Sequence, residues 1–206
     1  MPVVARFEPP ANDGLRVAAG RFDCVATLND GEEDPGEVFV REFVRSGEYE
    51  EAAAAGTSTT YIVTDPDEAA GELIGYVTLA LTQIRLSGGE KKAGERLAAV
   101  RVPDFGAIRI AMIGVDRRFA GRGYGKLLMD TVIQHTAHMS RDVSVRFIVA
   151  DAVNTQLAWY ERQGFVENRS KSEQERLAGI AERTGVPATS VRLDLGPDPR
   201  ILLPAD

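Results

Sequence analysis

Three closely spaced glycines stand ahead of an apolar run in the stretch VDRRFAGRGYGKLLM, Val115–Met129. They occupy positions 121, 123 and 125, with Arg122 between the first two and Lys126 after the last. Backbone N–H groups at the start of a helix lack intrahelical partners and point along the positive end of the helix dipole. Glycine lets the chain approach an anion closely and adopt positive φ. The glycines alone fit a structural turn better, and it is the flanking strand and helix that make the stretch predict a binding site for a phosphate group.

A strand before the glycines and a helix after them are needed to position such a site. Ala107–Val115 is apolar and predicts a strand, and Tyr124–Met139 has the spacing of an amphipathic helix. Ser144–Asp151 predicts the next strand, and Asn154–Phe165 a short helix that ends at Gly164. The order strand, glycine turn, helix, strand, helix predicts a mixed α/β sheet with helices packed on it.

The flanking regions add further elements to this centre. An acidic loop is expected at Asn29–Glu37, a polar connection over residues 88–96, and an irregular tail with three prolines over residues 196–206. The remaining patterns predict helices at Glu37–Ala55 and Glu173–Gly185, and strands at Thr59–Asp65, Glu72–Leu86 and Thr189–Gly196.

Length and composition limit the class of protein. The chain has 206 residues, of which 44% are hydrophobic, which suits one domain with a packed core. No apolar run has the length of a membrane helix, and the N-terminus lacks the apolar stretch of a secretory signal. Cys24 is the only cysteine, so a reducing cytoplasm is the expected location. His135 and His138 are expected at a helix end, and no metal site is predicted.

Charge is unevenly distributed along the chain, whose net charge is −7. Residues 1–84 carry −11, residues 85–147 carry +6 and residues 148–206 carry −2. The basic excess lies around the glycine stretch. An anionic ligand and ordinary surface charge are both consistent with this asymmetry.

Two familiar phosphate-binding motifs do not fit the glycines. A Walker loop needs glycine at position 120 and Ser or Thr at position 127, where this chain has Ala120 and Leu127. A dinucleotide fingerprint needs G-x-G-x-x-G, whereas the sequence is G-x-G-x-G. A nucleotide-phosphate enzyme is therefore disfavoured.

Two motifs together resemble the GNAT superfamily of acyl-CoA-dependent N-acetyltransferases. The first is the glycine loop after a central strand, for which the family pattern is [Q/R]-x-x-G-x-[G/A]. The second is WYERQGF, Trp159–Phe165, whose tyrosine follows Gly125 by 35 residues, which leaves room for one helix and one strand. The resemblance covers about residues 57–168 and extends to the strand around Val191.

The resemblance implies a fold and a domain organisation. The expected fold is a mixed, mostly antiparallel central sheet flanked by helices, with a V-shaped split between two central strands. A single domain is expected over residues 1–206. Its core covers about residues 57–195, with an N-terminal strand, loop and helix region over 1–56, an extra helix over 170–188 and the irregular tail.

The resemblance also assigns site residues. Acetyl-CoA would lie in the split, with main-chain N–H groups near Ile113 and Val115 holding its pantetheine arm. Tyr160 matches the residue that protonates the leaving CoA thiolate, as a hydroxyl close to sulfur can do; packing beside Trp159 is the alternative. The cofactor-binding set comprises Ile113, Val115, Ala120, Gly121, Arg122, Gly123, Tyr124, Gly125, Lys126 and Asn154.

The loop fits the family pattern in two registers. One begins at Arg118 and uses Gly121 and Gly123, and the other begins at Ala120 and uses Gly123 and Gly125. Spacing from the strand end favours the second, in which Ala120 replaces the usual Gln or Arg. Arg122 or Lys126 would then supply side-chain charge. Asn154 is one position nearer to the tyrosine than the corresponding family asparagine, and Tyr124 is interpreted equally well as a cofactor contact or as packing.

Upstream segments resemble a subgroup, the acetyltransferase toxins of bacterial toxin–antitoxin pairs. The segments are Arg21–Asn29, Thr59–Asp65, Leu73–Ala80 and Val102–Phe119. This resemblance implies aminoacyl-tRNA as acceptor and an antitoxin as partner. The N-terminal charge of −11 opposes tRNA binding.

The sequence is therefore consistent with more than one function. The first is acetyl transfer from acetyl-CoA to a primary amine by direct attack, with a small molecule, a peptide or aminoacyl-tRNA as acceptor. A non-catalytic acyl-CoA-binding module is the alternative from another class. The oligomeric state is left open, with a homodimer as one alternative.

Overall fold

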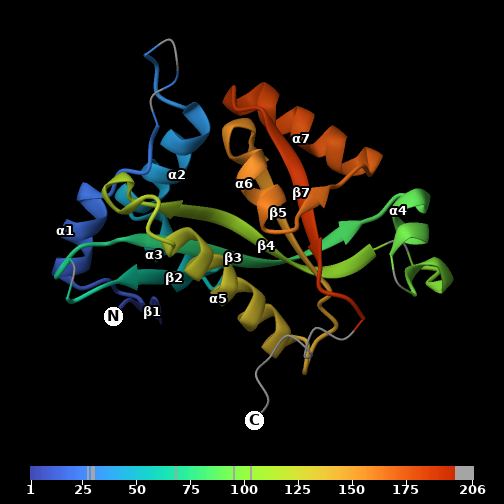
Figure 1. Cartoon of the computed structure of the whole chain (residues 1–206), viewed down its shortest axis with the longest axis horizontal. Helices are drawn as coiled ribbons and strands as arrows, with labels where there is room; N and C mark the ends of the chain where they lie inside the picture. Colours follow the sequence, from blue (N-terminus) through green and yellow to red (C-terminus); the bar gives the residue numbers. More distant parts are fainter. Residues whose placement is uncertain (27, 29–30, 68, 95, 103, 198–206) are drawn as a thin grey trace. The chain divides into compact units, whose positions relative to one another are not determined.

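The computed structural model describes residues 1–197, apart from residues 27, 29–30, 68, 95 and 103. The predicted irregular tail therefore lies mostly outside the described residues. Within them, seven strands form one mixed sheet in the order β1-β2-β3-β4-β5-β7-β6 (Figure 1). β4 and β5 run parallel, whereas β1–β2, β2–β3, β5–β7 and β6–β7 are antiparallel pairs. The predicted fold class, a mostly antiparallel mixed sheet flanked by helices, is confirmed.

Three elements, β3 (Gly75–Arg85), β4 (Asp104–Val115) and α5 (Tyr124–Met139), run through both of the compact units into which the chain divides. The first unit comprises residues 1–80 and 111–131, and the second comprises residues 81–110 and 132–206. The prediction of a single domain stays a prediction, and each unit is described by itself.

The first unit contains β1, β2 and the N-terminal helices. Their bounds are β1 Val3–Arg6, α1 Asp13–Arg21, α2 Pro35–Arg45, α3 Glu48–Ala54 and β2 Thr59–Thr64, with the short 3₁₀ helix η2 at Arg117–Phe119.

One continuous helix over Glu37–Ala55 was predicted, and this prediction is wrong. Gly47 has φ +86° and separates α2 from α3, because the left-handed conformation cannot continue a right-handed helix. Asp34 caps α2 instead, since its carboxylate accepts the backbone N–H of Gly36 at 2.8 Å.

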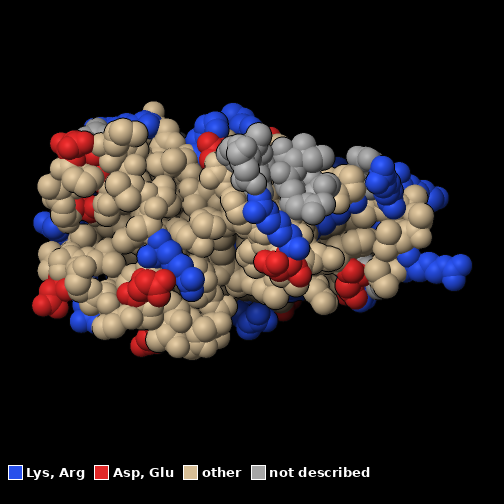
Figure 2. Space-filling model, turned by 90° about the horizontal axis from the view of Figure 1, so that it is seen from below, with Lys and Arg blue, Asp and Glu red and all other residues tan. Residues whose placement is uncertain are grey.

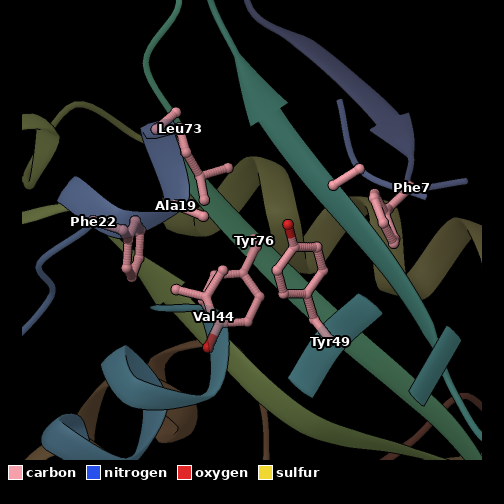
Figure 3. Packing of buried hydrophobic residues seen from close by; sticks show 9 residues of the cluster. Phe7, Ala19, Phe22, Val44, Tyr49, Leu73 and Tyr76 are labelled. Carbon is pink, nitrogen blue, oxygen red and sulfur yellow. The ribbon is translucent and has the colours of Figure 1, made fainter. Parts of the chain in front are cut away.

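The core of the first unit packs α1, α2 and α3 against β3. Figure 3 shows Tyr76 of β3 among Phe22, Val44 and Tyr49, and all four side chains are buried. The Tyr76 hydroxyl donates to the carbonyl of Val40 at 2.5 Å, so a buried polar group is satisfied inside this apolar cluster.

β3 begins at a glycine because there is no room for a side chain. A Cβ at Gly75 would lie 2.9 Å from the carbonyl oxygen of Gly114 and 3.3 Å from Leu128 of α5. Strand β4 and helix α5 therefore approach the start of β3 closely, immediately beside the glycine loop.

The second unit contains the remaining elements. They are α4 Gly88–Ala93, η1 Leu97–Ala99, β5 Phe147–Val153, η3 Asn154–Gln156, α6 Leu157–Arg162, β6 Val166–Glu167, α7 Lys171–Thr184 and β7 Ala188–Asp194. β4 pairs with β5 from Ala107↔Phe147 to Ile110↔Ala150, and β4 continues as a strand to Val115. Phe147 is buried and lies edge-on against Phe105, with ring centroids 5.8 Å apart.

The polar connection predicted over residues 88–96 contains the helix α4. Ser87 and Glu90 form a capping box: each side chain accepts the backbone N–H of the other residue. The extra helix predicted within residues 170–188 is present as α7, and Gly185, in the left-handed conformation, ends it.

Candidate active site

Gly121 and Gly123 give the glycine loop its shape. Their φ angles are +76° and +89°, and no heavy atom would lie within 4 Å of a Cβ at either position. The backbone conformation, and not crowding, therefore requires glycine at these two positions. The first hydrogen bond of helix α5 runs from the Leu127 N–H to the Gly123 carbonyl at 3.0 Å. The N–H groups of the first turn come before Leu127 and therefore lie outside the hydrogen-bond pattern of the helix.

Asp116, directly after β4, fixes the start of the glycine loop through hydrogen bonds. Its side chain is fully buried and accepts four hydrogen bonds, from the backbone N–H of Arg118 at 2.9 Å, the backbone N–H of Asp23 at 3.1 Å, and two guanidinium nitrogens of Arg118 at 2.9 and 3.0 Å. Burial alone would raise the pKa of this carboxyl, but the bonds from Arg118 and Asp23 outweigh burial and lower it. Sequence reasoning missed Asp116, because VDRR reads as an exposed polar turn.

Arg118 is held by carboxylates on both sides of its guanidinium. Besides Asp116, it donates to Glu72 at 3.0 Å. Arg118 thus ties the loop to the segment before β3. The register that begins at Arg118 uses Gly121 and Gly123, which both have positive φ. The register that begins at Ala120 uses Gly123 and Gly125, and Gly125 lies in the first turn of α5. The choice of register stays a prediction.

The other predicted loop residues differ in exposure. Ala120 is exposed, and its N–H bonds to the Arg117 carbonyl at 3.2 Å. The Arg122 guanidinium lies over the ring of Phe119, 5.6 Å from its centroid. Tyr124 is buried and lies edge-on against the same ring, with ring centroids 6.4 Å apart.

Lys126 lies on the first turn of α5 and is exposed. Its ammonium pairs with Asp130, one turn along the helix, at 2.6 Å. Ile113 and Val115, on β4 just before the loop, are partly buried. All predicted cofactor residues except Asn154 therefore belong to the first unit.

Tyr160 lies on α6 in the second unit, in an aromatic cluster. It is 5% exposed, with ring centroids 4.9 Å from Trp159 and 5.3 Å from Phe165, both edge-on. Gly164, with φ +88°, turns the chain so that Phe165 N–H donates to the Tyr160 carbonyl at 3.1 Å. The spacing of the Gly-Phe pair after the tyrosine therefore has a structural cause. Gly164 lets the chain turn, and the turn places the ring of Phe165 against the ring of Tyr160.

The acidity of the Tyr160 phenol is set by its surroundings. Burial raises its pKa, and the nearby carboxylate of Asp151 raises it further. The hydroxyl therefore stays protonated at neutral pH and can donate a hydrogen bond or a proton. Asn154, in η3 before α6, is exposed.

Asp151 joins three elements of the second unit. This β5 residue accepts a hydrogen bond from Arg109 of β4 at 2.8 Å and a bidentate pair from Arg176 of α7 at 2.6 and 2.9 Å. Arg176 also bonds Glu173 at 2.9 Å. Sequence reasoning missed this network, although a charge inside the apolar strand FIVADAV was a usable signal.

Cys24 is half-buried, and its surroundings set the acidity of its thiol. Burial raises the pKa of the Cys24 thiol to about 12, with a further contribution from Glu37, so the thiol is protonated at neutral pH. Among the described residues, no group of three His, Cys, Asp or Glu side chains is placed to hold a metal ion. In the same part of the chain, no helix combines the length and apolar character needed to cross a membrane.

The comparison with protein families assigns the chain. The model of the acetyltransferase (GNAT) family matches residues 26–165, which include both the glycine loop and Tyr160. The protein belongs to this family, whose acyl donor is acetyl-CoA. The resemblance inferred from the two motifs is confirmed.

Solved structures with the same fold include toxins. A bacterial toxin aligns with TM-score 0.69 at 18% identity, over 95% of this chain and 91% of its own. AtaT complexed with acetyl-methionyl-tRNAfMet aligns with TM-score 0.67 at 14% identity, over 95% of each chain. A mutant AtaT toxin bound to the C-terminus of the antitoxin AtaR and acetyl-CoA aligns with TM-score 0.61 at 17% identity, over 94% and 93%. At these identities the likeness establishes the fold, and no curated protein matched in the sequence comparison.

Proposed function

We propose that the protein transfers the acetyl group of acetyl-CoA to a primary amine. One observation supports the proposal most. In this chain of the GNAT family, the glycine loop has two glycines in the left-handed conformation directly before a 16-residue helix. Amide groups of such a loop, at the positive end of the helix, suit a pyrophosphate. Arg122 and Lys126, which are both exposed, add positive charge beside it.

Tyr160 is the proposed proton donor. Acetyl-CoA supplies an activated thioester, the amine nitrogen forms the new bond to the acetyl carbon, and the carbon–sulfur bond breaks. The Tyr160 hydroxyl donates its proton to the departing sulfur, and the proton released by the amine passes to water. A phenol kept protonated by burial suits this role.

Turnover of acetyl-CoA on a panel of amines tests this proposal. We expect release of free CoA, measured with a thiol reagent, and a loss of about a hundredfold or more in kcat for Tyr160→Phe with little change in acetyl-CoA affinity. The matched control is Tyr61→Phe on β2, which removes a phenol away from both motifs. Tight CoA binding without turnover on any amine, unchanged by Tyr160→Phe, would instead identify an acyl-CoA-binding module.

The acceptor favoured by the structural neighbours is the amino group of an aminoacyl-tRNA. The neighbours include AtaT complexed with acetyl-methionyl-tRNAfMet and AtaT bound to an antitoxin. On this proposal the chain is a cytoplasmic toxin with an antitoxin partner. We expect growth arrest when the chain is expressed and N-acetylated aminoacyl-tRNA when it is incubated with charged tRNA and acetyl-CoA. Active enzyme that leaves growth and charged tRNA unchanged would restrict the acceptor to other amines.

A further inference from the structure

Two arginines of the second unit bond one carboxylate near the proposed proton donor. Arg109 of β4 donates to Asp151 at 2.8 Å, and Arg176 of α7 donates to it at 2.6 and 2.9 Å. Figure 2 shows blue side chains beside red ones at several places on the visible surface, where water screens their charges. The side chains of Arg109, Asp151 and Arg176 are only 21%, 26% and 31% exposed. Their charges are therefore less screened and act more strongly on neighbouring groups.

The fold brings Asp151 near Tyr160. Asp151 lies on β5, and helix α6, which carries Tyr160, follows β5 after the short helix η3 and packs next to it (Figure 1). The Tyr160 ring also contacts Phe165, directly before β6, and β6 is joined through β7 to the middle of β5. Burial raises the pKa of the Tyr160 phenol most, and the Asp151 carboxylate raises it further, which agrees with this placement. The charged residues of α6 itself, Glu161 and Arg162, are exposed.

The charges around Asp151 are balanced. Arg176 also bonds Glu173 at 2.9 Å, so two guanidinium groups face two carboxylates. If Tyr160 gives its proton to a departing thiolate, a phenolate with one negative charge remains beside this cluster. An Asp151 carboxylate without partners would oppose that charge, whereas a guanidinium group offsets it, because a nearby opposite charge favours the ionised form. The two arginines therefore make proton donation by Tyr160 less costly than it would be beside Asp151 alone.

We propose that Arg109 and Arg176 are positioning residues for proton transfer, which act on Tyr160 by neutralising Asp151. This role rests on the proposed function, in which Tyr160 protonates the CoA sulfur. In that step the O–H bond of Tyr160 breaks, the S–H bond of CoA forms, and the phenolate then recovers a proton from water. Glu173 accepts two bonds from the Arg176 guanidinium and so helps to hold it on Asp151.

A fluorinated tyrosine at position 160 of the full-length protein measures this effect. Two fluorine atoms next to the hydroxyl lower the pKa of the phenol, so its ionisation can be followed while the protein is folded, and ¹⁹F NMR reports this one ring. We expect Arg109→Gln and Arg176→Gln each to raise the titration midpoint by about one pH unit, and Asp151→Asn to lower it by about as much. Asp151→Glu, which keeps the negative charge, should restore the wild-type midpoint. Arg109→Gln keeps a hydrogen-bond donor for Asp151, so it tests the charge without removing the carboxylate.

The matched control is the ion pair of Arg146 and Asp194, at the start of the β5–β7 ladder and away from Asp151. Arg146 donates to Asp194 at 2.7 and 2.9 Å. Asp194→Asn therefore breaks a bidentate pair of the same type and should leave the midpoint of position 160 unchanged. Equal shifts in Asp194→Asn and Asp151→Asn would show a general loosening of the unit and overturn the proposal. Shifts of the same sign in Arg109→Gln and Asp151→Asn would also overturn it.

Turnover separates this proposal from the function on which it rests. With the natural tyrosine, Arg109→Gln should lower kcat by about threefold and leave the KM for acetyl-CoA unchanged, because a weaker acid donates its proton more slowly. Midpoints that move as expected, in a protein that acetylates no amine, would support the action of the cluster on Tyr160 and overturn the proposed function instead. Turnover that depends on Tyr160, with midpoints that none of the three substitutions moves, would keep the proposed function and overturn this role of the arginines.

Discussion

Asp116 in the first unit and Asp151 in the second unit both bind arginine side chains. Asp116 orders a loop, whereas Asp151 connects strands and a helix. Asp116 is fully buried and accepts the backbone N–H groups of Asp23 and Arg118 besides the Arg118 guanidinium. The side chain of Asp151 is a quarter exposed, and the hydrogen bonds that it accepts in the described part of the chain come from the side chains of Arg109 and Arg176. A carboxylate that bonds backbone sets the path of a loop, whereas one that bonds side chains joins elements already formed. The difference predicts that substitution of Asp116 disturbs the glycine loop, whereas loss of a partner of Asp151 loosens helix α7.

Replacement of Asp116 should have the largest effect. In Asp116→Ala, two backbone N–H groups and the Arg118 guanidinium lose their acceptor, so the free energy of unfolding should fall by about 3 kcal/mol. Urea denaturation measures the loss, with Asp130→Asn as the control at an exposed carboxylate. Because Asp23 bonds Asp116, alkylation of the neighbouring Cys24 at pH 8 should also accelerate; an unchanged rate would show that Asp116 does not order this segment.

Acid should remove the contribution of Asp116 without any substitution. Its pKa is lowered on folding, so its contribution is complete above the unfolded value of about 3.9 and is lost as the pH falls through the folded value. The stability difference between wild type and Asp116→Asn should therefore be constant from pH 5 to pH 7 and shrink below pH 4. A difference that grows on acidification would contradict the assigned direction.

Loss of Arg176 should have a smaller and more local effect. In Arg176→Ala, Asp151 keeps Arg109, and its carboxylate, a quarter exposed, is partly solvated, so we expect a loss of about 1 to 2 kcal/mol. Hydrogen exchange should show faster opening of α7 and β7, with no change in Cys24 alkylation. Arg183→Ala, at the exposed end of the same helix, is the control. Equal effects of the two substitutions would mean that the pair with Asp151 does not hold α7.

Lys126 should give the smallest change in stability. Its exposed pair with Asp130 is worth about 0.3 to 0.5 kcal/mol, so Lys126→Ala should barely alter unfolding. If the ammonium leaves Asp130 for a phosphate, the KM for acetyl-CoA should rise several-fold while kcat stays constant. Lys126→Arg, which keeps the charge, should restore most of the affinity; an unchanged KM in Lys126→Ala would limit this residue to the helix pair.

Local patterns predicted the centre of the fold well. The apolar run before the glycines, the helix after them and the spacing to Tyr160 are all short-range features, and β4, α5 and α6 follow them. The helix break at Gly47 was missed because Phe39, Phe43 and Val44 continue the helical spacing up to it. Glycine in a helical pattern is a weak signal, and here the left-handed conformation prevailed.

Long-range pairs could not be predicted in this way. Asp116 meets Asp23, 93 positions earlier, and Glu90 meets Arg192, 102 positions later. Neither spacing has a periodic pattern, so the burial of these charges depends on the assembled sheet. Ser87 and Glu90, by contrast, form a local capping box that the sequence already contained, and α4 was predictable from it.

The protonated, half-buried state of Cys24 makes the chain convenient to label. Burial raises the pKa of this single native thiol, so we expect it to react slowly at pH 7.5. A cysteine introduced at the exposed Ala120 would then take a dye selectively, with no need to mutate the native one. A fluorophore there would sit at the mouth of the glycine loop. If acetyl-CoA binds the glycine loop as proposed, the emission would report its arrival and departure in real time, on the same protein used in the turnover assay.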